Sequence, residues 1–81
     1  MENIIKVLKE NNFIKTVGGY KRNINNSFVT IDFKFKGEKI LAIIIDEYAV
    51  DEDECIIFMD ETKTYFKPTI EEAFTILNSY L

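Results

Sequence analysis

The segment from residue 28 to residue 48, FVTIDFKFKGEKILAIIIDEY, constrains the fold more than any other part of the chain. In residues 28–35 the odd positions are all apolar and the even positions are mostly polar, which is the pattern of a strand with one buried face. Lys36-Gly37-Glu38 is typical of a tight hairpin turn. Residues 39–47 form the next strand, in which residues 40–45 are apolar on both faces. The segment therefore predicts two antiparallel strands joined by a short turn.

The residues before this hairpin indicate a further strand region. Residues 13–17 (FIKTV) have the composition of a first strand. The glycine pair Gly18-Gly19 is interpreted as a bulge or kink rather than the end of the pairing, because residues 20–22 can continue the strand. Residues 23–27 (NINNS) form a turn cluster.

A third apolar run follows the hairpin. Residues 55–59 (CIIFM) are interpreted as a buried strand, and residues 64–66 pair with it across a turn at residues 60–62. Because residues 55–59 are continuously apolar, both of their faces are expected to be covered.

Helices are predicted at both ends of the chain. Residues 2–11 place Ile4, Ile5 and Leu8 at helical spacing, and the Asn11-Asn12 pair can end this helix in the left-handed conformation. At the other end, Thr69 and Glu72 form a capping box directly after Pro68. The apolar stripe of this second helix is Ile70, Ala73, Phe74, Leu77, Tyr80 and Leu81.

These elements predict an α+β fold with an N-terminal helix, a four- to five-stranded antiparallel sheet and a C-terminal helix. With 81 residues, the chain is expected to form a single domain, 1–81, whose helices pack on one face of the sheet.

The register of the hairpin suggests a candidate dimer face. With a two-residue loop, the odd positions of residues 28–35 share a face with the even positions of the next strand. Leu41, Ile43 and Ile45 then lie on the opposite face, where an exposed apolar stripe would mark a dimer or partner surface. Two alternatives remain: a helix or the loop 48–54 covers the stripe, or a three-residue loop with a bulge reverses the register.

The residue types present exclude several kinds of chemistry. The chain has no histidine, so the commonest general base and metal ligand is absent and neither Ser27 nor Ser79 can belong to a Ser-His-Asp triad. Cys55 lies in an apolar run, where a thiol is usually inert packing. The Gly18-Gly19 pair lacks the spacing of a phosphate loop. A domain this small rarely encloses a catalytic cleft, so no enzyme activity is expected.

No metal or other cofactor is expected either. An EF-hand loop counted from Asp51 would put Ile56 at the position that needs glycine and Thr62 at the position that needs the bidentate glutamate. Weak divalent-cation binding by Asp51, Asp53 and Glu54 is the remaining alternative.

Direct nucleic-acid binding and membrane insertion are not expected. A basic edge could form, but ten basic residues include only one arginine and the net charge is −4. No apolar run approaches the ~18 residues of a membrane span. The N-terminus lacks a signal-peptide core, and the lone Cys55 fits a reducing cytoplasm, so a cytoplasmic location is expected. The residues of the candidate basic edge are Tyr20, Lys21, Arg22, Lys34, Lys36 and Lys39.

The strongest asymmetry in the chain is its charge. Residues 1–45 contain eight basic and four acidic groups, whereas residues 46–81 contain two basic and ten acidic groups. Eight of the acidic groups fall within residues 46–61, which contain no Lys or Arg. They are interpreted either as solvated connections or as a partner-binding edge in two groups roughly 17 Å apart, one at each end of the strand 55–59. The eight are Asp46, Glu47, Asp51, Glu52, Asp53, Glu54, Asp60 and Glu61.

Small size, acidic charge and lack of catalytic motifs are also typical of small inhibitors encoded by phages and mobile elements, including anti-CRISPR proteins and uracil-DNA glycosylase inhibitors. One region is similar to the glycosylase inhibitors in its order: an apolar strand, an acidic connection, a second apolar strand, and a turn ending in Tyr65-Phe66-Lys67-Pro68. The similarity covers about a third of the chain, and the C-terminal helix departs from the ending of that family, so it does not assign the chain to it.

The sequence leads to two functional hypotheses. The first is a non-enzymatic inhibitor of the DNA-mimic kind, which binds a basic nucleic-acid-binding protein through its acidic edge. The alternative is a small homodimeric accessory domain that associates through Leu41, Ile43 and Ile45.

Overall fold

The computed structural model describes residues 2–24, 27–53 and 55–81, and these residues form two helices and one five-stranded antiparallel sheet. The predicted α+β fold is confirmed. In chain order, the elements are α1 (Glu2–Glu10), β1 (Ile14–Thr16), β2 (Gly19–Ile24), β3 (Ser27–Lys36), β4 (Lys39–Val50), β5 (Ile56–Phe66) and α2 (Ile70–Asn78).

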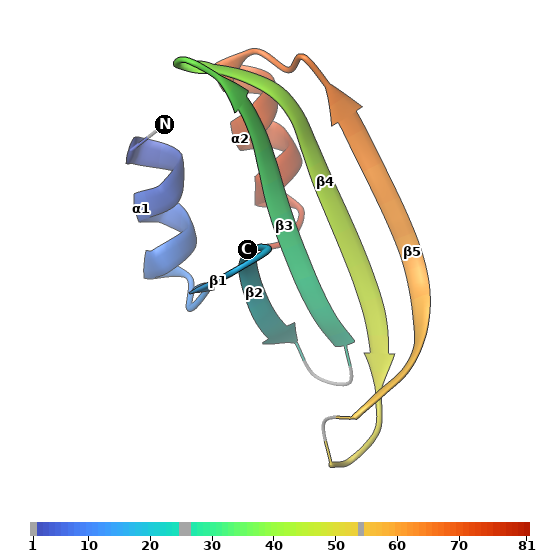
Figure 1. Ribbon diagram of the computed structural model, residues 1–81. Coiled ribbons are helices and arrows are strands. Elements are labelled where there is room, and N and C mark those ends of the chain that lie inside the picture. Colours follow the sequence, from blue (N-terminus) through green and yellow to red (C-terminus); the bar gives the residue numbers. More distant parts are fainter. Residues whose placement is uncertain (1, 25–26, 54) are drawn as a thin grey trace.

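The strands follow one another across the sheet in the order β1-β2-β3-β4-β5, so β1 and β5 are its edges. Both helices lie on the same side of the curved sheet, and the β4–β5 hairpin extends beyond them (Figure 1). In the described part of the chain, no helix combines the length and the apolar character that a membrane crossing requires.

The core lies between the two helices and one face of the sheet. Helix α1 contributes Ile4 and Leu8, and α2 contributes Ala73 and Leu77, each at most 1% exposed. These side chains pack in one cluster with the inward-facing residues of β2, β3 and β4. The buried sheet residues of the cluster are Tyr20, Val29, Ile31, Phe33, Ile40, Ile43 and Ile45.

A bulge in the β3–β4 hairpin decides which residues of β4 are buried. The connection is a two-residue loop, the case for which the candidate dimer face was derived, with Gly37 at a φ of 62°. However, Phe35 pairs with Ile40 whereas Lys34 pairs with Ala42, so Leu41 is an extra residue in β4. A bulge shifts the face of every following side chain. The odd positions of β3 therefore share a face with the odd positions of β4 beyond the bulge.

The predicted dimer face is consequently wrong. Ile43 lies opposite Phe33 and Ile45 lies opposite Ile31, and both isoleucines are at most 1% exposed in the core. Leu41, at the bulge, is 38% exposed. The three residues do not form one exposed stripe.

The glycine pair forms part of a turn, not a bulge within one strand. Thr16 pairs with Gly19, so Val17 and Gly18 form the two-residue connection between β1 and β2. Gly19 has a φ of 132°, and a Cβ there would collide with the backbone oxygen of Ile31 in β3. Glycine thus lets β2 begin in close contact with β3.

The turn predicted at residues 60–62 is also absent. Strand β5 runs without interruption from Ile56 to Phe66 and pairs with β4 along its length. Glu61 lies opposite Glu47 while Met59 lies opposite Tyr48, so Asp60 is an extra residue at a bulge. The polar residues that suggested a turn are therefore part of a long edge strand.

The predicted end of α1 and the predicted start of α2 are confirmed, whereas α2 ends at Asn78, before Tyr80 and Leu81 of its predicted stripe. Asn12 has a φ of 68°, and the Asn11 side-chain amide donates a 2.8 Å hydrogen bond to the Val7 carbonyl oxygen. At α2 the Glu72 backbone N–H donates to Thr69 Oγ1 at 3.1 Å, and the Thr69 N–H donates to Glu72 Oε1 at 3.2 Å. These reciprocal bonds satisfy two of the free N–H groups of the first turn.

Candidate functional site

The acidic residues of the sequence gather on the β4–β5 hairpin. Asp46 and Glu47 lie within β4, and Asp60 and Glu61 lie within the neighbouring part of β5. We call residues 46–61 the acidic hairpin. The predicted grouping is therefore corrected, because residues expected in two separate connections are side by side on adjacent strands.

A second acidic group occupies the hairpin tip. Asp51, Glu52 and Asp53 are all exposed there, and Glu54 lies outside the described residues. Asp51 also has a structural task, since its Oδ1 accepts hydrogen bonds of 2.9 Å from the N–H groups of both Asp53 and Cys55. Such side-chain bonds stabilise a turn. Of the three described acidic residues of the tip, Glu52 and Asp53 have side chains that accept no hydrogen bond within the turn.

The Glu47 side chain lies on the face of the sheet that the helices cover, and it is partly buried. Its neighbours in the ladder, Val29 and Glu61, place it on the face that α2 covers. Burial raises the pKa of the Tyr80 hydroxyl after the end of α2; the nearby Lys63 opposes this shift, and the Glu47 carboxylate adds to it. Glu47 is therefore part of a polar group inside the hairpin.

Lys63 completes this polar group. Its Nζ lies 3.6 Å from Glu61 Oε1, with both side chains nearly half exposed. The pKa of Lys63 is raised, first by the charge of Tyr80 and then by that of Glu61. Glu61 is thus partly neutralised within its own strand, whereas Asp60 projects from the bulge and is exposed.

Three lysines of β3 and β4 lie at the other end of the sheet. Lys36 and Lys39 face each other beside the β3–β4 turn, and Lys34, 3.1 Å from Asp32, lies next to them on β3. The molecule is 39 Å long, and this turn and the tip of the acidic hairpin are at opposite ends (Figure 1). The two ends of the molecule therefore differ in charge, which orients a charged partner on approach, although Lys21 and Arg22 of β2 lie level with Asp46 and Glu47 across β3.

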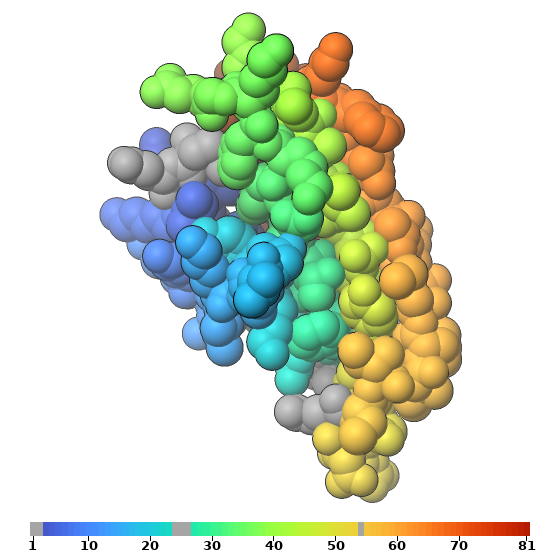
Figure 2. All heavy atoms as spheres, viewed as in Figure 1, coloured from blue at the N-terminus to red at the C-terminus, as the bar shows by residue number. Residues whose placement is uncertain are grey.

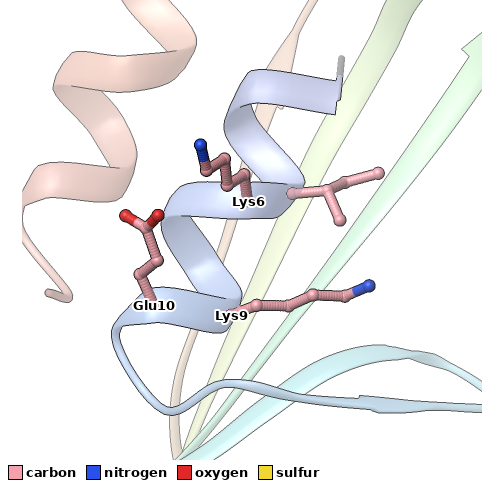
Figure 3. Close-up of a pocket in the computed structure, with 4 residues that line it drawn as sticks. Lys6, Lys9 and Glu10 are labelled. Atoms are coloured by element: carbon pink, nitrogen blue, oxygen red, sulfur yellow. The ribbon is translucent and has the colours of Figure 1, made fainter.

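One surface hollow, on α1, does not have the lining of a small-molecule site. A surface hollow is lined by Ile5, Lys6, Lys9 and Glu10, all from α1, and Lys9 points away from Lys6 and Glu10 (Figure 3). Ligand sites usually bring polar groups from several elements together. Among the described residues, no three Asp, Glu or Cys side chains are grouped so that they could hold a metal ion.

The structure also exposes apolar residues that were expected to be buried. Ile56, Ile57, Phe58 and Met59 are each between 53% and 60% exposed, because β5 is an edge strand whose distal part extends beyond the helices. Cys55 precedes β5 and is exposed, so its prediction as inert packing is wrong. Sequence periodicity could not reveal this exposure, because a continuous apolar run is the same for a central and an edge strand.

Comparison with known proteins gives no match: no family model, no curated protein and no solved structure resembles the chain closely enough to bear on its function.

Proposed function

We propose that this chain is a non-enzymatic binding protein that inhibits a nucleic-acid-binding protein by occupying its basic surface with the acidic hairpin. The observation that carries the proposal is the clustering of Asp46, Glu47, Asp60 and Glu61 on adjacent strands, with a second acidic group at the tip. Residues 46–61 contain no Lys or Arg, and the nearest basic residue along β5 is Lys63, beside Glu61.

The spacing of the two groups supports a nucleic-acid mimic. Asp46 and Asp51 are five residues apart, or roughly 17 Å along a strand. One strand of DNA carries a phosphate about every 3.4 Å of helix axis, so this length corresponds to roughly five phosphates. A hairpin that is already folded presents its charges at a lower entropy cost than a disordered chain, which favours tight binding.

Three carboxylates are the best candidates for partner contact, because they are exposed and the hairpin does not use them in its own hydrogen bonds or ion pairs. They are Glu52, Asp53 and Asp60. Asp51, Glu47 and Glu61 also stabilise the hairpin or neighbour Lys63, so changing them would alter structure as well as charge.

The test compares two variants that carry the same change in net charge. The hairpin variant is Glu52→Gln, Asp53→Asn and Asp60→Asn, and the control is Glu10→Gln, Glu38→Gln and Glu71→Gln, all exposed acids outside the acidic hairpin. Each immobilised protein is used to capture partners from cells of its source at low salt, and each partner is then purified and its affinity measured.

The wild type and the control should bind the same basic protein, and the hairpin variant should bind it at least ten-fold more weakly. Double-stranded DNA or RNA, whichever the partner binds, should compete with the wild type for that partner, and binding should weaken as salt rises. Equal affinity of all three proteins, or a partner whose binding nucleic acid does not affect, would overturn the proposal.

A further inference from the structure

Strand β5 forms one edge of the described sheet, and its outer side has no partner strand there. It is 11 residues long, and among the described strands β4 alone pairs with it. In the space-filling view, β5 forms the right-hand rim of the molecule, without a helix in front of it (Figure 2). Long exposed edges present unpaired backbone N–H and C=O groups and readily pair with another strand. Ile56 to Met59 add exposed apolar side chains to this edge.

We propose that a second copy of this chain pairs with β5 in antiparallel orientation, so that two five-stranded sheets join into one across a two-fold axis. Such symmetric pairing is the usual arrangement of a homodimer, in which the same surface is used twice. The inference does not rest on the function proposed for the acidic hairpin, although the paired edge includes residues 56–61 of that hairpin.

Charge favours one register of this pairing. In a two-fold antiparallel pair, the residue on the axis faces its own copy, and residues equally far from it face each other. An axis at Asp60, Glu61 or Lys63 would place like charges directly opposite each other, which destabilises a sheet. An axis at Thr62 places Glu61 of each copy opposite Lys63 of the other.

This register extends the ion pair that already exists within the strand. Glu61 and Lys63 are on the same face of β5, 3.6 Å apart, and their side chains are 49% and 42% exposed. In the dimer, these two residues from each copy form a group of four alternating charges. The pairing also brings Lys63 close to Glu61 of the second copy. This attraction offsets the repulsion between Glu47 of β4 and Glu61 of β5 within one copy.

The same register covers the exposed apolar run. On its inner side, β5 places Thr62, Glu61, Met59, Phe58 and Ile56 opposite consecutive ladder positions of β4, with bulges at Asp60 and Ile57. We let the second copy pair with these five residues of β5 and leave the two bulge residues unpaired. Its residues 62–66 then lie opposite Thr62, Glu61, Met59, Phe58 and Ile56, in that order. Phe58 then faces Tyr65 of the second copy, and Ile56 faces Phe66 of the second copy.

Phe66 gains most from this arrangement, because 78% of its side chain is exposed in the single chain. Aromatic and β-branched cross-strand pairs are among the stabilising pairs of antiparallel sheets. The two-fold axis repeats each pair, so both apolar runs are covered.

Crosslinking tests the register. In a Cys55→Ser background, Thr62→Cys should form an intermolecular disulfide under mild oxidation, since opposed Cα atoms are about 4.5–5.5 Å apart, within disulfide range. Val17→Cys, in the exposed β1–β2 turn, is the control, and Thr62→Cys should crosslink at least ten-fold faster. Equal rates, or faster crosslinking of Thr64→Cys than of Thr62→Cys, would overturn the proposal.

Sedimentation equilibrium tests the charge pairing in the otherwise unchanged chain. The wild type should reach twice the 9.5 kDa mass of one chain at high concentration. Lys63→Glu should weaken association at least ten-fold, and the double change Glu61→Lys with Lys63→Glu should restore it. Circular dichroism checks that each variant is folded. A wild type that stays at 9.5 kDa at millimolar concentration, or a folded double variant no tighter than Lys63→Glu alone, would show that β5 does not pair in this way.

Discussion

Glu47 of β4 and Glu61 of β5 lie directly opposite each other, so the sheet contains a cross-strand pair of like charges. Such pairs destabilise a sheet. Lys63, at 3.6 Å from Glu61, provides the nearest opposing charge, and the Tyr80 hydroxyl lies beside the same group. Lys63 therefore offsets part of the repulsion between Glu47 and Glu61, in a small polar cluster that also includes Tyr80.

This cluster predicts that the fold becomes less stable at alkaline pH. The pKa values of Tyr80 and Lys63 are raised above their ordinary values of 10.0 and 10.5. Both groups therefore hold a proton more tightly in the folded chain than in the unfolded one, and stability falls as pH rises above about 10. Urea unfolding between pH 8 and 11 should show this fall.

Tyr80→Phe identifies the tyrosine contribution to that fall. The phenyl ring keeps the packing of Tyr80 but has no proton to lose, so the decline above pH 10 should be smaller than in the wild type. Tyr48→Phe, on the opposite face of the sheet, is the control and should keep the wild-type decline. If the two variants decline equally, Tyr80 is not the residue that titrates.

The bulge at Leu41 predicts a large difference between neighbouring apolar residues of β4. Ile43→Ala removes a side chain that is fully buried, which typically costs about 2–5 kcal/mol. Leu41→Ala should cost less than about 1 kcal/mol, because its side chain is 38% exposed. Chemical denaturation of both variants at one protein concentration measures the difference. Equal costs would argue for the opposite register.

Gly18 and Gly19 should respond in opposite ways to alanine. A Cβ on Gly19 would collide with the Ile31 backbone, and its φ of 132° is strained for any L side chain. Gly19→Ala should therefore destabilise by more than about 1 kcal/mol. A Cβ on Gly18 meets nothing within 4 Å, so Gly18→Ala should be neutral or slightly stabilising. Thermal unfolding of the pair checks this contrast.

Patterns of a few neighbouring residues predicted where α1 ends and where α2 begins. The register of β3 and β4 depends on pairing between distant residues, and the sequence did not predict it. The capping box at Thr69 and the left-handed Asn12 depend on a few neighbouring residues, so their pattern can be read directly. The bulge at Leu41 cannot be read in this way, because residues 40–45 are apolar on both faces and fit either register. Only packing against Ile4, Leu8 and the other core residues distinguishes them.

The acidic site was predicted in composition but not in arrangement. Asp60, Glu61 and Thr62 have the composition of a turn, yet they lie inside a long edge strand, where Glu61 and Thr62 pair with β4 and Asp60 forms a bulge. An edge strand tolerates such residues because one side of it remains in water. For the same reason the apolar residues 56–59 can be exposed, although their sequence is that of a buried strand.

The exposure of Cys55 provides a final prediction. Its thiol lies at the start of β5, outside the core, and should react with a disulfide reagent in the folded protein. The native rate should be within about ten-fold of the rate in urea, because access rather than unfolding limits a surface thiol. The matched control is Ile43→Cys in a Cys55→Ser background, which places the only thiol at a position with 0% exposure. The control should react only on unfolding, and a wild-type thiol equally slow in the native state would place Cys55 in a protected site.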